Sequence, residues 1–210
     1  MKIILAGPPR SGKSCLRHAL PKAVARVSQD RHYLYVIKGA PDGEGAWFHE
    51  TCERDDSEAF TLRNEYKYPI TEEFTTRLER EVACCDAPLT AIDIGGRVSD
   101  ENRRICRAAS HAVLLAGNHP ERGNWQERLI EWHRFCGELG IEVIAELQSD
   151  YDASQDEITG LGPDGIFRAS IHHLERGEPI SDRPAILELA RHILRLVQEQ
   201  TRIQGEPLQG

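Results

Sequence analysis

Short, almost wholly apolar runs alternate with longer amphipathic runs along most of the chain. Apolar runs of this length, which end in glycine or polar residues, are typical of buried strands. The longer runs repeat their apolar positions with the spacing of helices. We expect strands within residues 2–7, 32–39, 88–96, 111–118, 141–149 and 165–174. We expect helices over residues 13–27, 71–84, 100–110, 124–140 and 183–203.

Proline and glycine refine three of these helices. Pro21 should bend or break the first helix, because its ring removes one backbone hydrogen bond. Gly140 should end the fourth helix, and Pro184 fits the first turn of the last one. We expect a single domain over residues 1–200 with an insertion at about 39–70, and a frayed tail over 201–210.

The alternation of strands and helices predicts an α/β fold. Parallel strands need a helical crossover between them, and the helices then cover both faces of the sheet. We therefore expect three layers, with a mainly parallel central sheet between two layers of helices.

Composition narrows the classes of function. The net charge of −8 and the pI of about 5.6 argue against strong nucleic-acid binding, which needs a basic face. No apolar run approaches the roughly 20 residues of a membrane-spanning helix, so we expect a cytoplasmic protein. The six cysteines form no CxxC pair, which favours reduced thiols over a zinc site.

The stretch GPPRSGKSC at residues 7–15 is the strongest candidate for chemistry. Gly7, Gly12, Lys13 and Ser14 fit G-x-x-x-x-G-K-[ST] between a predicted strand and a predicted helix. Glycines would let backbone N–H groups approach phosphate, Lys13 would reach the outer phosphates, and the Ser14 hydroxyl would hold Mg²⁺. The alternative is an ordinary glycine turn, which the strand–loop–helix context disfavours.

This stretch resembles the Walker A motif of P-loop NTPases. The resemblance implies the P-loop NTPase fold, with ATP and Mg²⁺ as ligands. Arg10 would touch phosphate or a neighbouring subunit, or stay exposed. We expect the nucleotide to contact Gly7, Pro8, Arg10, Ser11, Gly12, Lys13, Ser14, Cys15 and Gly96.

Asp93 is the candidate for the second Mg²⁺-binding group, beside Ser14. It ends the predicted strand at 88–96, and with Gly96 it fits the D-x-x-G motif of GTPase-like proteins. The alternative is a carboxylate that caps the following helix. Arg97 stands where Ras-type GTPases place a water-orienting glutamine, and arginine has no acceptor for the attacking water. We therefore expect slow hydrolysis, with Lys13, Asp93 and Arg97 as the catalytic set.

ATP is the expected nucleotide. The segment AELQSDYD at residues 145–152 lacks the N-K-x-D motif with which GTPases recognise guanine. A homo-oligomer is a reasonable expectation, because many P-loop switches complete their site across an interface.

Other polar groups leave alternatives open. Asp42 and Glu44 would accept a proton in a kinase, or they lie in a surface turn that Trp47 and Phe48 anchor. Arg122 and Arg128 fit a kinase lid or a solvated helix face. A metal site at His172 and His173 is disfavoured.

Four segments also resemble the P-loop ATPase domain found joined to, or encoded beside, a CRISPR-associated ring nuclease. They are GPPRSGKS, PDGEGAWFHET, DIGGR and LERG. The resemblance implies an accessory role in type III CRISPR cyclic-oligoadenylate signalling, with the ring nuclease as partner. It extends to the ATPase part and not to nuclease activity. A small-molecule or nucleotide kinase and a non-hydrolysing nucleotide-binding module remain the alternatives.

Overall fold

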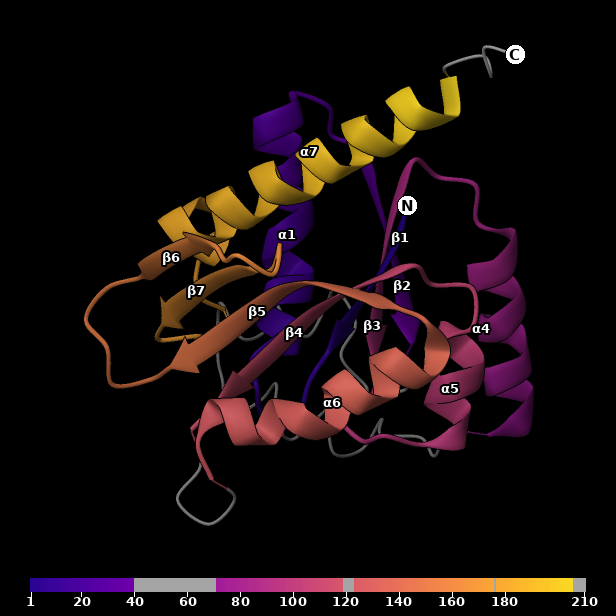
Figure 1. The fold of residues 1–210 in the computed structure, drawn as a ribbon, viewed down its shortest axis with the longest axis horizontal. Coiled ribbons are helices and arrows are strands. Elements are labelled where there is room, and N and C mark those ends of the chain that lie inside the picture. Colours follow the sequence, from indigo (N-terminus) through magenta and orange to yellow (C-terminus); the bar gives the residue numbers. More distant parts are fainter. Residues whose placement is uncertain (40–70, 119–122, 176, 206–210) are drawn as a thin grey trace.

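A computed structural model describes residues 1–39, 71–118, 123–175 and 177–205 of the 210-residue chain, with the backbone alone over 203–205. Seven strands form one sheet (Figure 1). They are β1 (Lys2–Ala6), β2 (Leu34–Gly39), β3 (Leu89–Ile94), β4 (His111–Gly117), β5 (Glu142–Asp150), β6 (Glu157–Leu161) and β7 (Phe167–His172).

The sheet has the order β2-β3-β1-β4-β5-β7-β6. All neighbouring pairs are parallel except β6 and β7, which are antiparallel at one edge. β1 lies between β3 and β4, and Leu5 of β1 pairs in register with Asp93 of β3. The carboxyl ends of β1 and β3 therefore meet at the same edge of the sheet, which is where ligands of parallel sheets bind.

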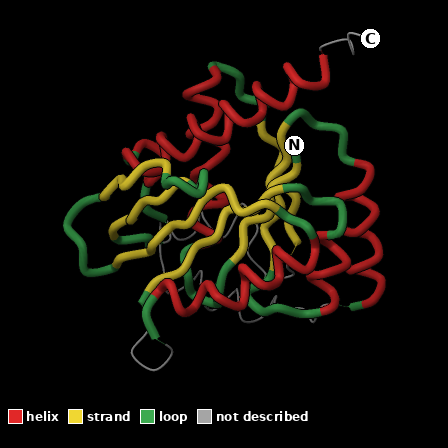
Figure 2. Tube along the Cα trace, in the orientation of Figure 1, coloured by secondary structure: helices red, strands yellow, loops and turns green. Residues whose placement is uncertain are grey.

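Helices cover both faces of this sheet. On one face α1 (Lys13–Ser28) and α7 (Pro184–Gly205) pack together, and η1 (Ile180–Asp182) lies beside α1. The other face carries α4 (Glu72–Cys84), α5 (Asp100–Cys106) and α6 (Trp125–Leu139). Figure 2 shows the strands between the two helical layers. The predicted three-layer α/β fold is confirmed.

Two hydrophobic cores explain why the strands are almost continuously apolar. Ile3 and Leu5 of β1 face the core that α1 and α7 cover. Ile4 and Ala6 of the same strand face the core beneath α4, α5 and α6. Because alternate side chains of a strand point to opposite faces, a strand that is covered on both sides must be apolar throughout.

The helices begin largely where the sequence places a capping side chain. Thr71, Ser99 and Asn124 each accept a backbone hydrogen bond from the first turn of α4, α5 and α6. Gly140 ends α6 in the left-handed conformation, as expected.

Four features differ from the sequence-based expectation. α5 ends at Cys106, four residues before its expected end at residue 110. α1 runs through Pro21 without a break. α7 continues to Gly205, two residues beyond its expected end. The strand β6 was not predicted, because its five residues are mostly exposed and include Gly160 in a left-handed conformation. The expected insertion falls mainly on residues 40–70, which lie outside the described residues, as do Asp42, Glu44, Trp47, Phe48 and Arg122.

Within the described residues, no helix combines the length and the apolar character that crossing a membrane requires.

Candidate phosphate-binding site

The loop between β1 and α1 is shaped by two glycines in left-handed backbone conformations. Gly7 has φ 144°, and a Cβ there would lie 1.9 Å from the carbonyl oxygen of Leu115. Gly12 has φ 87°, and its Cβ would lie 2.7 Å from Cδ1 of Leu174. Both positions therefore require glycine, and the backbone can pass closely under whatever the loop binds.

Lys13 folds back over this loop. Its Nζ donates hydrogen bonds to the Gly7 carbonyl at 2.7 Å, the Pro8 carbonyl at 2.9 Å and the Ser11 hydroxyl at 3.3 Å. Lys13 is 8% exposed, so its ammonium is held at the loop and does not extend into solvent. An anionic oxygen is a stronger acceptor than a carbonyl, so a phosphate can exchange for these partners.

The amino-terminal end of α1 faces the same loop. The bond from the Leu16 N–H to the Gly12 carbonyl closes the first turn of α1, which starts at Lys13. The amides of this first turn point along the helix axis toward the loop, and the helix dipole adds partial positive charge there. This is the arrangement by which helices bind phosphate.

A residue of α6 also contacts the loop. Arg128 of α6 donates from NH2 to the Pro9 carbonyl at 3.3 Å and from NH1 to the Gly117 carbonyl at the end of β4. Arg128 is thus half-buried against the loop, which differs from a solvated helix face. Arg10 is exposed, with φ 61°.

Asp93 lies at the end of β3, one residue before its last, and is 3% exposed. Its Oδ2 accepts a hydrogen bond from NH1 of Arg17 in α1 at 2.9 Å, which forms a buried ion pair. The alternative role for Asp93, as a cap of α5, is not observed because the side chain of Ser99 caps that helix.

Ser14 and Asp93 fit a site in which Mg²⁺ would bind both the protein and a phosphate. Both supply oxygen atoms, the ligands that Mg²⁺ prefers. Ser14 precedes Arg17 by three residues on α1, and Arg17 contacts Asp93, so hydroxyl and carboxylate belong to adjoining elements. The described residues contain no group of three or more His, Cys, Asp or Glu side chains that could hold a metal. A cation bound here would therefore need water or nucleotide oxygens as further ligands.

The D-x-x-G turn packs against the loop. A Cβ at Gly96 would lie 2.9 Å from the backbone nitrogen of Pro9, so only glycine allows this approach. Asn102 is buried in α5 and donates from Nδ2 to the carbonyls of Gly95 at 3.1 Å and Arg97 at 2.7 Å. Arg97 itself is exposed. Among the described residues, its guanidinium has no hydrogen-bond or ion-pair partner.

A third segment borders the loop at the end of β7. Leu174 packs on Gly12, and its carbonyl accepts a hydrogen bond from Sγ of Cys15 at 3.8 Å. Beside it, the rings of Tyr151 and His173 lie 4.4 Å apart between centroids. The Tyr151 hydroxyl also donates to Oε1 of Glu175 at 2.6 Å.

The two adjacent histidines do not act together. Nδ1 of His172 lies 2.6 Å from Oδ1 of Asp156, whose other oxygen accepts the Ala185 N–H at the start of α7. His172 therefore joins β7 to α7, while His173 turns toward Tyr151. This arrangement supports a structural role for His172.

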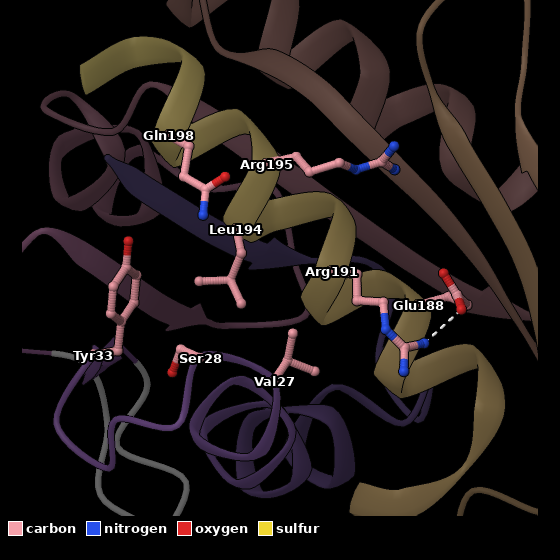
Figure 3. A pocket seen from close by; sticks show the side chains of 8 residues that line it. All are labelled: Val27, Ser28, Tyr33, Glu188, Arg191, Leu194, Arg195 and Gln198. Carbon is pink, nitrogen blue, oxygen red and sulfur yellow. Dashed lines mark hydrogen bonds and ion pairs between the residues drawn. The ribbon is translucent and has the colours of Figure 1, made fainter. Parts of the chain in front are cut away.

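A hollow of about 580 Å³ lies on the α1–α7 face of the sheet (Figure 3). It is lined by Val27, Ser28, Tyr33, Glu188, Arg191, Leu194, Arg195 and Gln198. Val27 and Ser28 end α1, whose 16 residues span ~24 Å from its start at the loop. The hollow is thus separate from the candidate phosphate site.

Sequence reasoning selected the loop and Asp93 as candidates, and it did not select Arg17 or Asn102. Arg17 gave one signal, since it follows Lys13 by four residues and so shares its helix face. Asn102 gave none, because the position of α5 over the D-x-x-G turn depends on the tertiary fold.

Comparison with known proteins supports the fold. No protein-family model matches the chain, and no curated protein matches it. Among solved structures, it is similar to the septum site-determining protein MinD from Pyrococcus horikoshii OT3, complexed with Mg-ADP. That match has 12% identity, a TM-score of 0.54, and covers 97% of each chain.

A second similar structure is a putative plasmid partition protein from Borrelia burgdorferi B31 bound to AMPPNP. It has 11% identity and a TM-score of 0.54, and the match covers 95% of this chain and 98% of that chain. At such identities the likeness concerns the fold alone. The chain therefore has the α/β fold of P-loop NTPases.

Proposed function

We propose that the protein binds ATP with Mg²⁺ at the loop between β1 and α1 and hydrolyses it slowly, as a regulatory or accessory ATPase. The observation that carries this proposal is the loop itself. Gly7 and Gly12 adopt conformations that only glycine allows without strain, and three acceptors within the described part of the loop hold Lys13 above them. The amino-terminal end of α1 faces the same point.

Each residue has a defined task in this proposal. The Lys13 ammonium and the first-turn amides of α1 bind the outer phosphates and offset their charge. Ser14 and Asp93 hold Mg²⁺, which when bound neutralises charge that develops on the γ-phosphate. Gly96 lets the D-x-x-G turn approach the loop, and Asn102 fixes the carbonyls on either side of Gly96.

Slow turnover follows from Arg97. Its guanidinium has five donors and no acceptor, so it cannot take a hydrogen bond from the attacking water. Arg97 is exposed, so a second subunit or a partner can engage it. An arginine that reaches the phosphates of a neighbouring subunit raises the hydrolysis rate by roughly 10³- to 10⁵-fold in other NTPases.

Asp150 supports a preference for ATP over GTP. It lies in the segment at residues 145–152, where GTPases would carry the aspartate of N-K-x-D that recognises guanine. The Oδ1 atom of this carboxylate accepts the N–H groups of Asp152 and Ala153, and Oδ2 accepts from Nε2 of Gln148 at 3.1 Å. A carboxylate engaged in its own turn is poorly placed to accept from guanine.

The decisive experiment incubates purified protein with ATP and Mg²⁺ over a wide dilution series and measures ADP, free phosphate and phosphorylated acceptors. We expect slow phosphate release that rises per subunit with protein concentration and falls in Arg97→Ala. Arg107→Ala is the matched control, because Arg107 is 72% exposed at the far end of α5. Fast turnover by dilute protein, unchanged in Arg97→Ala, would refute the regulatory role. Phosphate transfer to an acceptor would favour a kinase, and binding without turnover a passive module.

The partner is part of the proposal. The resemblance to a CRISPR-linked ATPase motivates a purified CRISPR-associated ring nuclease as the first candidate, added to the same assay. Of the segments behind that resemblance, residues 41–51 lie outside the described part of the chain. No change in turnover at saturating ring nuclease would remove this candidate while leaving ATP binding intact.

A further inference from the structure

A buried ion pair lies beneath the candidate phosphate site, between Arg17 of α1 and Asp93 of β3. NH1 of Arg17 and Oδ2 of Asp93 are 2.9 Å apart, and the two side chains are 6% and 4% exposed. One of these residues is the proposed Mg²⁺-binding acid, yet it already has a cation at hydrogen-bond distance.

The position of Arg17 on its helix explains the contact. It follows Lys13 by four residues and Ser14 by three, so all three lie within about one turn on one side of α1. Lys13 contacts the loop. Arg17 lies one helical turn further along α1, and its longer side chain reaches Asp93 near the end of β3. The phosphate-binding helix itself therefore supplies the cation for Asp93.

The charges of these groups determine what the site attracts. Lys13 and Arg17 carry one positive charge each and Asp93 one negative charge, so the three together are positive. A buried carboxylate needs a compensating charge, and losing one partner of such a pair is unfavourable. Without Arg17, the site would lose one positive charge, and the charge of Asp93 would repel an incoming polyphosphate more strongly.

We propose that Arg17 is a resident counter-ion of Asp93 that competes with divalent cations for this carboxylate. It is a positioning residue, because it acts through Asp93. Since Arg17 already balances Asp93, polyphosphate binding to the loop depends little on Mg²⁺. This inference rests on the proposed function where it concerns nucleotide, but the competition between Arg17 and a divalent cation can be measured without one.

The test uses the full chain, as wild type and as Arg17→Met, Arg17→Lys, Asp93→Asn and the Arg17→Met/Asp93→Asn double variant. Methionine matches much of the length of arginine without its charge, and lysine restores the charge. Affinity for a fluorescent ATP analogue is measured in EDTA and in Mg²⁺. Thermal unfolding with and without Mg²⁺, in the absence of nucleotide, is the second readout.

We expect Mg²⁺ to change the affinity of the wild type by about 3-fold or less and that of Arg17→Met by about 10-fold or more, mainly through weaker binding in EDTA. Arg17→Lys should resemble the wild type, and the double variant should lose the Mg²⁺ dependence. An equal Mg²⁺ effect in wild type and Arg17→Met would overturn the proposal.

Two further results keep the test decisive. If Arg17→Met does not fold, Asp93→Asn should bind the analogue more tightly than wild type in EDTA, because a negative charge beside the loop is removed. Weaker or equal binding would overturn the proposal. If the wild type binds no analogue at all, the proposed function fails. The thermal data then decide the role of Arg17. Mg²⁺ should raise the Tm of Arg17→Met more than that of the wild type. Equal Tm shifts would overturn the proposal that Arg17 competes with Mg²⁺ for Asp93.

Discussion

Two buried carboxylates of the sheet, Asp93 and Glu146, are each paired with an arginine but differ in where they lie. Asp93 is near the carboxyl end of β3, beside the candidate phosphate-binding loop. Glu146 is in the middle of β5, in register with Arg168 of β7. Arg168 binds it at 2.9 Å, and Nε2 of His133 in α6 lies 2.9 Å from its other oxygen.

The surroundings of the two pairs differ as well. Arg17 is 6% exposed, whereas Arg168 and His133 are 29% and 40% exposed as side chains. Arg168 is also shared with Asp164 at 2.7 Å. Glu146 therefore belongs to a structural network that joins β5, β7 and α6. A buried carboxylate paired with arginine therefore does not by itself indicate a site. Asp93 is the candidate because it lies at the edge where ligands of parallel sheets generally bind.

The largest expected effect comes from removing the loop cation. Lys13→Ala should lower the affinity for ATP by about 100-fold or more, because a buried ammonium next to phosphate is lost. Equilibrium binding of a fluorescent ATP analogue measures this. Lys22→Ala is the control, since Lys22 lies exposed on the same helix. Unchanged affinity in Lys13→Ala would show that this loop is not the phosphate site.

Replacing each carboxylate in turn separates their roles. Asp93→Ala should lower Mg²⁺-dependent turnover by about 100-fold while nucleotide still binds, because the metal loses a ligand. Glu146→Ala should keep the turnover of the folded protein. Phosphate release and analogue binding are measured on both variants. Normal turnover in Asp93→Ala would place the metal-binding acid elsewhere, with Asp42 and Glu44 as the next candidates.

A change at the structural pair should affect stability alone. Arg168→Met should lower the free energy of unfolding by about 1–3 kcal/mol, because Glu146 stays buried with less compensating charge. Denaturant unfolding measures the loss, and nucleotide affinity should stay at the wild-type value. A loss of affinity without a loss of stability would contradict the structural role of this network.

The smallest effect concerns pH. Hydrogen bonds from His133, and then from Arg168, hold the pKa of Glu146 below its usual value of 4.5. The unfolded chain takes up this proton first, so the contribution to stability is present above about pH 4.5 and is lost as pH falls through the lowered pKa. Unfolding measured between pH 3 and 6 should show a shallower acid decline in Glu146→Gln than in wild type, and identical declines would exclude Glu146 as a cause.

Local features of the sequence determined the fold class and the loop. The apolar runs predicted six of the seven strands, because buried parallel strands are apolar on both faces. Backbone geometry requires the glycines at 7 and 12, and the lysine at 13 lies in the same short segment. Asp93 was identified for a similar reason, since its place at the end of a strand can be recognised from sequence.

Only the tertiary structure determined the partners that come from distant segments. The strand β6 is stabilised by its pairing with β7, not by an apolar pattern of its own. Arg128 contacts Pro9 across 119 residues, and Arg17 contacts Asp93 across 76. Local propensity and periodicity report on neighbours within a turn or a strand. Which arginine compensates which carboxylate depends on how the helices pack on the sheet. Local sequence patterns do not contain that information.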